Sequence, residues 1–430
     1  MRLPIVHTRG QCRHVRTDRP LTDRKNRACP VPVPICLPLR ENLNHFASNL
    51  SGKGLSSSRL PPFSVWSRLT RIAEERATSM SERLIITTHR PKAQQDLLHL
   101  LVARRGVYGV HAFSSATAWP EAAAGGLNHA VLDRQPAGLT CWIIEQPRVD
   151  DLATKLRQIR PGAILHAPLL GLPASASPLE EYQAVVNGTL IWLEAVRQAC
   201  PQVPFIHLSS SLVYGDRADT IAREERGDRF EFTDPAYVPG LTEAFPIEGS
   251  THSLLGAAAV AADVLAQEYA RSYHLPVMCL RVDSLCDPGN GPEDRRDVLS
   301  QMIHCCLTGT EFIIHGHRGR QVREIVSSRD LATLIEAVIQ EPHAGEIYNV
   351  GGGPTGSASL EEMMHQVDAL TGKVLWRTYR DYPQPGEPAC YYGNPRHLRY
   401  HFPKWKARES WKEVASRAAE AQMNLPLDPM

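Results

Sequence analysis

From Leu84 onward, short apolar segments alternate with helical segments, and this rhythm constrains the fold more than any other feature of the chain. The strand-length apolar runs are residues 84–87, 106–111, 141–144, 163–166, 205–208 and 277–281. Helical spacing falls between them, at residues 93–103, 150–158, 179–199 and 251–273. Continuous apolar strands that alternate with helices are typical of a parallel sheet buried on both faces. The sequence therefore predicts an α/β fold with a doubly wound parallel sheet.

The rhythm changes after about residue 286. Strand and helix patterns at 311–315, 328–340, 346–350 and 359–371 predict a smaller mixed α/β lobe. We expect a doubly wound α/β domain at 80–285 and a smaller C-terminal lobe at 286–430 that is interleaved with it. A cleft between two such lobes is the expected ligand site.

Residues 1–79 differ from the rest of the chain. They are rich in Arg, Pro and Ser and have no sustained periodicity, which predicts a disordered extension. An Arg-rich targeting peptide is the alternative, although Asp18 and Asp23 argue against it. Met80, followed at once by a strand pattern, is a second candidate start, so the sequence leaves open whether the mature protein contains residues 1–79.

Composition excludes several classes of protein. A net charge of +1 with 22% charged residues gives no bulk attraction to nucleic acid or to an anionic membrane. No apolar run reaches the roughly 18 residues that a membrane span needs. The ten cysteines form no C-x-x-C pair, which favours reduced thiols in a cytoplasmic protein.

Four stretches, in order along the chain, carry a family resemblance. They are GTLIWLEAVR at 188–197, IHLSSSLVYGD at 206–216, QVRE at 321–324 with Asp330, and EIYNVGG at 346–352. Together they resemble the extended short-chain dehydrogenase/reductases, the NAD-dependent nucleotide-sugar epimerases and dehydratases. Within that family they resemble the CDP-tyvelose (CDP-paratose) 2-epimerase branch. The resemblance covers roughly residues 84–370 and implies a Rossmann-like fold, an NAD(P) cofactor and a nucleotide-sugar ligand.

The glycine-rich turn that such a cofactor needs is absent. Its three glycine positions correspond to Thr88, Pro91 and Gln94, where side chains crowd the phosphate and Pro91 removes an N–H donor. The acidic residue expected to hold the adenosine ribose corresponds to Ala112. These replacements argue against NAD(P) binding of the usual kind. The basic residues at 89, 90 and 92 are read either as a phosphate attractor or as a solvated loop.

The catalytic pair of the family is absent as well. The resemblance implies a Tyr that transfers a proton and a Lys one helical turn later that lowers the pKa of the phenol. These positions correspond to Leu255 and Ala259, and neither side chain can transfer a proton. The family's Ser position is retained as Ser210, whose hydroxyl either meets substrate or satisfies backbone groups at the end of a strand.

The nucleotide-sugar half keeps more of the family pattern. The resemblance implies that Gln321 and Arg323 contact nucleotide or phosphate. An internal ion pair of Arg323 with Asp330 or Glu324 is the alternative. The His-Gly-His stretch at 315–317 lacks a matching carboxylate or Cys pattern, so we expect no metal site.

Two helical segments, 179–199 and 251–273, correspond to those that form a four-helix bundle across the dimer in this family. The replacements at Leu255 and Ala259 are apolar helix formers, as though the second helix had been repacked. The resemblance implies a homodimer or a heterodimer formed through these helices.

Three functions remain open. The leading hypothesis is a catalytically degenerate family member that acts as a binding, regulatory or assembly subunit. The second is an active NAD-dependent epimerase or dehydratase with unusual catalytic groups, for which His252 is the candidate acid/base. The third is a nucleotide-sugar sensor that uses Arg323 and needs no NAD.

Overall fold

The computed structural model describes residues 83–88, 97, 100, 101, 110–115, 139–144, 148–172, 176–286 and 297–424. All of these residues belong to one compact unit, Thr70–Met430. The predicted extension at 1–79 and the cofactor-loop positions Pro91 and Gln94 lie outside the described residues.

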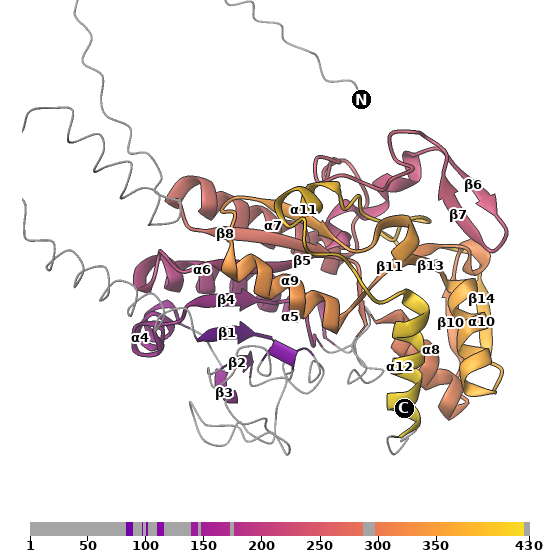
Figure 1. Ribbon diagram of the computed structural model, residues 1–430, viewed down its shortest axis with the longest axis horizontal. Coiled ribbons are helices and arrows are strands. Elements are labelled where there is room, and N and C mark those ends of the chain that lie inside the picture. Colours follow the sequence, from indigo (N-terminus) through magenta and orange to yellow (C-terminus); the bar gives the residue numbers. More distant parts are fainter. Residues whose placement is uncertain are drawn as a thin grey trace, which may run out of the picture. The chain divides into compact units, whose positions relative to one another are not determined.

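A seven-stranded parallel sheet forms the centre of the fold (Figure 1). Its strand order reverses between β4 and β1, and in doubly wound sheets ligands bind beside such a reversal, at the carboxyl ends of the strands. In spatial order the strands are β12 (Ile347–Val350), β8 (Val277–Val282), β5 (Phe205–Ser210), β4 (Ala163–His166), β1 (Leu84–Thr87), β2 (Val110–Ser115) and β3 (Leu139–Ile144).

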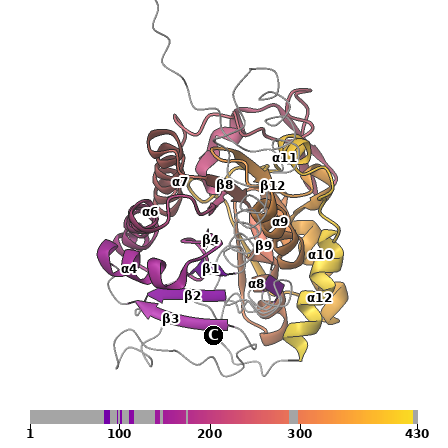
Figure 2. The same ribbon diagram turned by 60° about the vertical axis from the view of Figure 1, so that its left-hand side comes forward.

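Helices cover both faces of this sheet, with α4, α6 and α7 on one side and α9 on the other (Figure 2). Alternate strand residues point to opposite faces, so Ile85 and Phe205 pack in one apolar cluster whereas Ile86 and Ile206 pack in the other. The covering helices are α4 (Val149–Ile159), α5 (Pro178–Tyr182), α6 (Gly188–Ala199), α7 (Leu254–Tyr273) and α9 (Ser328–Gln340).

Two predicted elements differ from those in the structure. The second strand runs from Val110 to Ser115 rather than over 106–111, because its pairing with β1 and β3 involves the later residues. The single helix predicted at 179–199 is α5 and α6 joined by a π-helical turn, Gln183–Asn187. An extra residue in such a turn shifts the faces of the two flanking helices relative to each other.

The remaining elements build a smaller mixed region, with its own apolar core from α8, α10, α12 and the strands beside them. Its strands form a β9–β11–β13 sheet and a β10–β14 pair, and a β6–β7 hairpin completes the fold. The bounds are β6 (Arg223–Arg226), β7 (Arg229–Phe232), β9 (Ser284–Cys286), α8 (Val298–Thr308), β10 (Phe312–His315), β11 (Val322–Ser327), β13 (Ser357–Ser359), α10 (Leu360–Thr371), β14 (Arg377–Arg380), α11 (Arg396–His401) and α12 (Trp411–Met423).

No helix in the described part of the chain is both long and apolar enough to span a bilayer.

Candidate functional site

The candidate site lies at the carboxyl ends of the central strands, where Thr88 follows β1, His166 ends β4 and Ser210 ends β5. In a parallel sheet these ends share one edge. The amino end of α7 lies beside them, because α7 packs against β5 and against the segment that follows that strand. The sheet therefore brings together the first glycine position, the strand-end serines and the helix with the catalytic positions.

A buried threonine occupies the position that the resemblance assigns to the first glycine of the cofactor turn. Thr88 is buried, and its hydroxyl donates a hydrogen bond to the Leu170 carbonyl at 3.0 Å. A glycine here would leave open the space that this side chain fills. The position therefore holds a fixed side chain where the family resemblance implies a close backbone approach to phosphate.

Beside Thr88, the buried His166 links β1 to the first turn of α6. The hydroxyl of Thr189 donates to the Val185 carbonyl at 2.6 Å, so its oxygen accepts from His166 Nε2 at 3.0 Å. The other ring nitrogen, Nδ1, then accepts from the hydroxyl of Thr87. This hydrogen-bonded chain ties β1, β4 and the π-helical turn together through the Val185 carbonyl.

The two catalytic positions lie in an apolar environment. Ser253 caps α7 by accepting a hydrogen bond from the Gly256 N–H at 3.0 Å. Leu255 is half-buried and Ala259 is buried, and both belong to an apolar cluster with Val213. Neither residue can donate or accept a proton at these positions.

The three strand-end serines have protein partners. Ser210 accepts a hydrogen bond from the Leu212 N–H at 3.3 Å. Ser209 donates to Asp263 at 2.6 Å, and Ser211 donates to Asp283. These contacts agree with the structural alternative for Ser210, in which its hydroxyl satisfies a backbone group.

A buried ion pair lies behind the serines, and the sequence interpretation missed it. Arg281 donates to both carboxylate oxygens of Asp263, at 2.7 and 3.1 Å, and both side chains are almost fully buried. Arg281 also donates to the Tyr214 hydroxyl at 3.0 Å, which donates to Asn349 at 2.7 Å. Although burial works to raise it, the guanidinium holds the pKa of Asp263 below its usual value. Arg281 is the one charged residue in the apolar strand β8, and this could have indicated a buried ion pair from the sequence.

A buried glutamate and a half-buried aspartate form a second unpredicted network. Glu324 accepts hydrogen bonds from the N–H groups of Gly353 at 2.6 Å and Gly393 at 2.9 Å. Asp283 accepts from the Glu324 N–H at 2.8 Å. Burial raises the pKa of Glu324 to about 8 and also raises that of Asp283. The backbone contacts of Glu324 give this network a structural role in holding two loops together.

A family model described as NAD dependent epimerase/dehydratase family matches residues 97–351, more than half of the chain. The chain belongs to this family. Four stretches carried the resemblance. The matched range contains three of them completely and all but the last residue of the fourth.

Curated relatives are similar over part of their length. The dTDP-glucose 4,6-dehydratase of Neisseria gonorrhoeae is 30% identical over 205 residues, which is 45% of this chain and 53% of that protein. A trifunctional UDP-glucose 4,6-dehydratase/UDP-4-keto-6-deoxy-D-glucose 3,5-epimerase/UDP-4-keto-L-rhamnose-reductase of Arabidopsis thaliana is 29% identical over 166 residues, 39% of this chain and 22% of that protein. The matched part of the chain thus spans from about a fifth to about half of these two relatives.

Solved structures support the fold. The dTDP-glucose 4,6-dehydratase of Bacillus anthracis, solved in complex with NAD, aligns with a TM-score of 0.59 at 18% identity. The alignment covers 79% of this chain and 96% of that one. This likeness establishes a Rossmann-type α/β fold for the chain. The resemblance to the CDP-sugar branch stays a prediction.

At the positions that the resemblance assigns to the NAD site, the described residues differ from the family pattern. The Thr88 side chain fills the first glycine position, and Ala259 offers no ammonium group for the nicotinamide ribose. Ala112 lies in β2, opposite Ile86 of β1. An alanine has no carboxylate with which to hold the adenosine ribose. The positions of Pro91 and Gln94 lie outside the described residues.

The predicted nucleotide contacts are held by protein groups. Gln321 donates from Nε2 to the His315 carbonyl at 3.0 Å. Arg323 donates to the Pro388 carbonyl at 2.8 Å and to Glu387 at 3.0 Å. The internal ion pair that was the alternative for Arg323 thus forms, but its partner is Glu387 rather than Asp330 or Glu324. Both carboxylates are engaged by backbone N–H groups instead, those of residues 408 and 409 for Asp330 and those of residues 353 and 393 for Glu324.

Proposed function

We propose that this chain is a non-catalytic member of the NAD dependent epimerase/dehydratase family that acts as a binding or assembly subunit. The observation that carries the proposal is the distribution of apolar residues on the two sides of α7. The buried side of the helix has Leu255 and Ala259 where the family pattern has its proton-transfer pair, whereas its outer side presents an apolar stripe. Loss of general acid/base catalysis alone costs about 10²- to 10⁴-fold in rate.

The outer stripe of α7 follows helical spacing. Leu254, Ala257, Ala261 and Val264 recur at three- and four-residue intervals, and Leu254 and Val264 are 67% and 44% exposed. The stripe becomes charged beyond Val264, at Glu268. An apolar surface that is bounded by charged residues is typical of a protein–protein contact.

The neighbouring helix pair extends this surface. α6 packs beside α7, and Tyr269 of α7 donates a hydrogen bond to Glu194 of α6 at 2.6 Å. Leu179 and Tyr182 of α5 are 65% and 49% exposed, and Leu190 of α6 is 39% exposed. We propose that a second copy of the chain covers this surface, so that two helical segments from each copy form a four-helix bundle.

The two alternatives receive less support. For an active enzyme, His252 would have to transfer protons, yet its Nε2 lies 2.9 Å from the Ile247 carbonyl and its Nδ1 lies 3.3 Å from the Leu212 carbonyl. For a nucleotide-sugar sensor, a ligand would have to displace Glu387 from Arg323. A nucleotide-sugar ligand thus remains the weaker proposal.

The substitution Val264→Glu tests the assembly role. We expect it to weaken self-association roughly 100-fold or more, because each dimer would bury two uncompensated carboxylates. Light scattering after size-exclusion chromatography, over a range of concentrations, measures the change.

Val374→Glu is the matched control, because Val374 is 81% exposed and lies outside both helical segments. It should leave the dimer intact. A wild-type chain that is monomeric at tens of micromolar, or a Val264→Glu variant that dimerises as the wild type does, would show that this surface is not the interface.

A further inference from the structure

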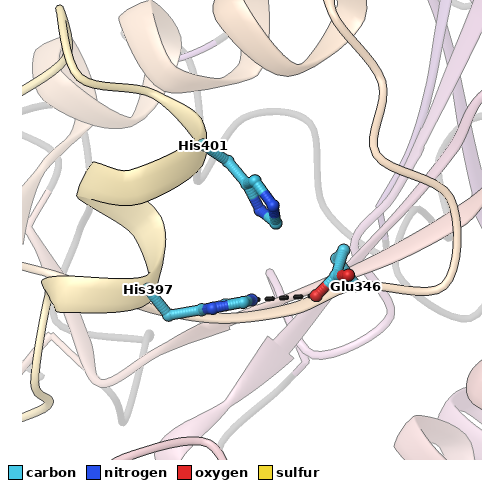
Figure 3. Close-up of side chains that lie close together, drawn as sticks. All are labelled: Glu346, His397 and His401. Carbon is cyan, nitrogen blue, oxygen red and sulfur yellow. Dashed lines mark hydrogen bonds and ion pairs between the residues drawn. The ribbon is translucent and has the colours of Figure 1, made fainter.

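Three side chains with metal-ligating atoms converge at the β12 edge of the main sheet (Figure 3). They are Glu346, just before β12, and His397 and His401 on α11. One ligand atom from each lies within 4.8 Å of the other two. This group, the Glu346–His397–His401 cluster, includes the first residue of the EIYNVGG stretch, but neither histidine was singled out in the sequence.

The backbone holds the two histidines on one face of α11. Positions four apart on a helix lie one above the other, so both rings project toward Glu346. α11 is anchored by two residues of the main apolar core. Leu398, between the two histidines, is fully buried, and Phe402 directly follows the helix. Glu346 is fixed from the other side, because its carbonyl accepts a hydrogen bond from the Cys279 N–H of β8 at 3.0 Å.

The ring orientation of His401 leaves one nitrogen for a ligand. Its Nδ1 lies 2.7 Å from the Tyr348 hydroxyl, and Tyr348 is buried in β12. If Nδ1–H donates to this oxygen, Nε2 presents its lone pair. A second hydrogen-bonded partner that orients a ligating imidazole in this way is a regular feature of metal sites. His343 stacks on the same ring with centroids 4.2 Å apart and an angle of 13° between planes, which restricts its rotation.

The alternative is a simple surface ion pair. His397 Nε2 lies 2.8 Å from a Glu346 carboxylate oxygen, and an exposed pair of this kind contributes about 0–1 kcal/mol. That interpretation explains the contact of His397 with Glu346 but does not explain why the His401 ring also lies beside this carboxylate.

The geometry points to a divalent transition-metal site, formed by the Glu346–His397–His401 cluster and suited to Zn²⁺. Two imidazoles with one carboxylate form a common zinc ligand set, with water completing the tetrahedron. Ligand atoms about 2.1 Å from zinc lie about 3.4 Å from one another, so modest side-chain rotation closes the present spacing. Ca²⁺ and Mg²⁺ prefer all-oxygen ligands and fit less well.

This site is separate from the candidate site described above. Glu346 precedes β12, so the cluster lies at the amino ends of the parallel strands, whereas Ser210 lies at their carboxyl ends, as the last residue of β5. A bound ion would tie α11 to β12 and stabilise the edge of the sheet. The inference does not depend on whether the chain is catalytic.

Zinc titration of the untagged, chelator-treated full chain, followed by calorimetry, tests the proposal. We expect one high-affinity Zn²⁺ per chain, with Kd in the micromolar range or below, and a melting temperature that rises with added Zn²⁺. His397→Ala and His401→Ala should each weaken binding at least tenfold. Glu346→Gln, at a half-exposed position, tests the same set with less risk to folding.

His365→Ala is the matched control, because His365 is exposed and pairs with Glu361 but has no second imidazole in the described part of the chain within reach of a shared ion. It should bind as the wild type does. Wild-type binding weaker than about 100 μM would overturn the proposal. So would unchanged affinity in the cluster variants, which would place the zinc elsewhere, for example on Cys12, Cys29 or Cys36.

Discussion

Asp263→Ala is expected to lower the free energy of unfolding by about 3–5 kcal/mol. Removing the carboxylate leaves the Arg281 guanidinium buried without its charge partner, and it also removes the acceptor of the Ser209 hydroxyl. An uncompensated buried charge is among the most destabilising changes that a single substitution can make. Urea unfolding followed by circular dichroism measures the loss.

The exposed ion pair between Glu268 and Arg271, on the same helix, provides the control. Glu268→Ala should change stability by less than about 1 kcal/mol, because exposed pairs contribute little. Replacing both buried partners, with Asp263→Ala and Arg281→Met, should recover part of the loss. Equal effects of Asp263→Ala and Glu268→Ala would show that the buried pair does not stabilise this fold.

Gly351→Ala is expected to destabilise the chain by about 3 kcal/mol or more. A Cβ at this position would lie 2.0 Å from a carboxylate oxygen of Glu324 and 2.1 Å from its Cδ. Glu324 cannot move aside without giving up its hydrogen bonds from Gly353 and Gly393. This close approach explains physically why the EIYNVGG stretch needs glycine here.

Gly356→Ala, in the same region of the chain, is the matched control. No atom lies within 4 Å of a Cβ built at Gly356, and its φ is not positive. We expect this variant to keep wild-type stability to within about 0.5 kcal/mol. The same urea experiment compares the two. If Gly351→Ala unfolds at the same denaturant concentration as Gly356→Ala, the packing described for Glu324 is wrong.

The fold could be predicted because each central strand is a short apolar run with a clear boundary. Residues 163–166 and 205–208 fall inside β4 and β5. The start of β2 could not be predicted, since residues 106–111 are apolar too and only pairing with β1 and β3 selects Val110–Ser115. The π-helical turn at Gln183–Asn187 was also beyond reach, because the helical spacing continues through it.

The departure from the family's catalytic pattern could be inferred from residue types alone, because Leu255 and Ala259 carry no ionisable group. What replaced it depends on tertiary contacts. The hydrogen bond from Thr88 joins residues 82 positions apart, and the pair of Asp263 and Arg281 joins a helix to a strand. No local pattern marks such partners.

The metal cluster was missed for the same reason. Glu346 and His397 are 51 positions apart in the chain. The spacing of His397 and His401 by four residues was a usable signal, but without a carboxylate nearby in sequence it did not distinguish a site from an ordinary helix.

Calorimetric titration of the purified chain with NAD⁺, NADH, NADP⁺ and NADPH tests the central claim most directly. The fixed Thr88 side chain at the first glycine position and the absence of a Lys at Ala259 predict that none of the four binds with a Kd below about 1 mM. The chain would then lack the hydride acceptor on which the family's chemistry depends. Micromolar binding of any of the four would contradict the account and restore the active-enzyme hypothesis.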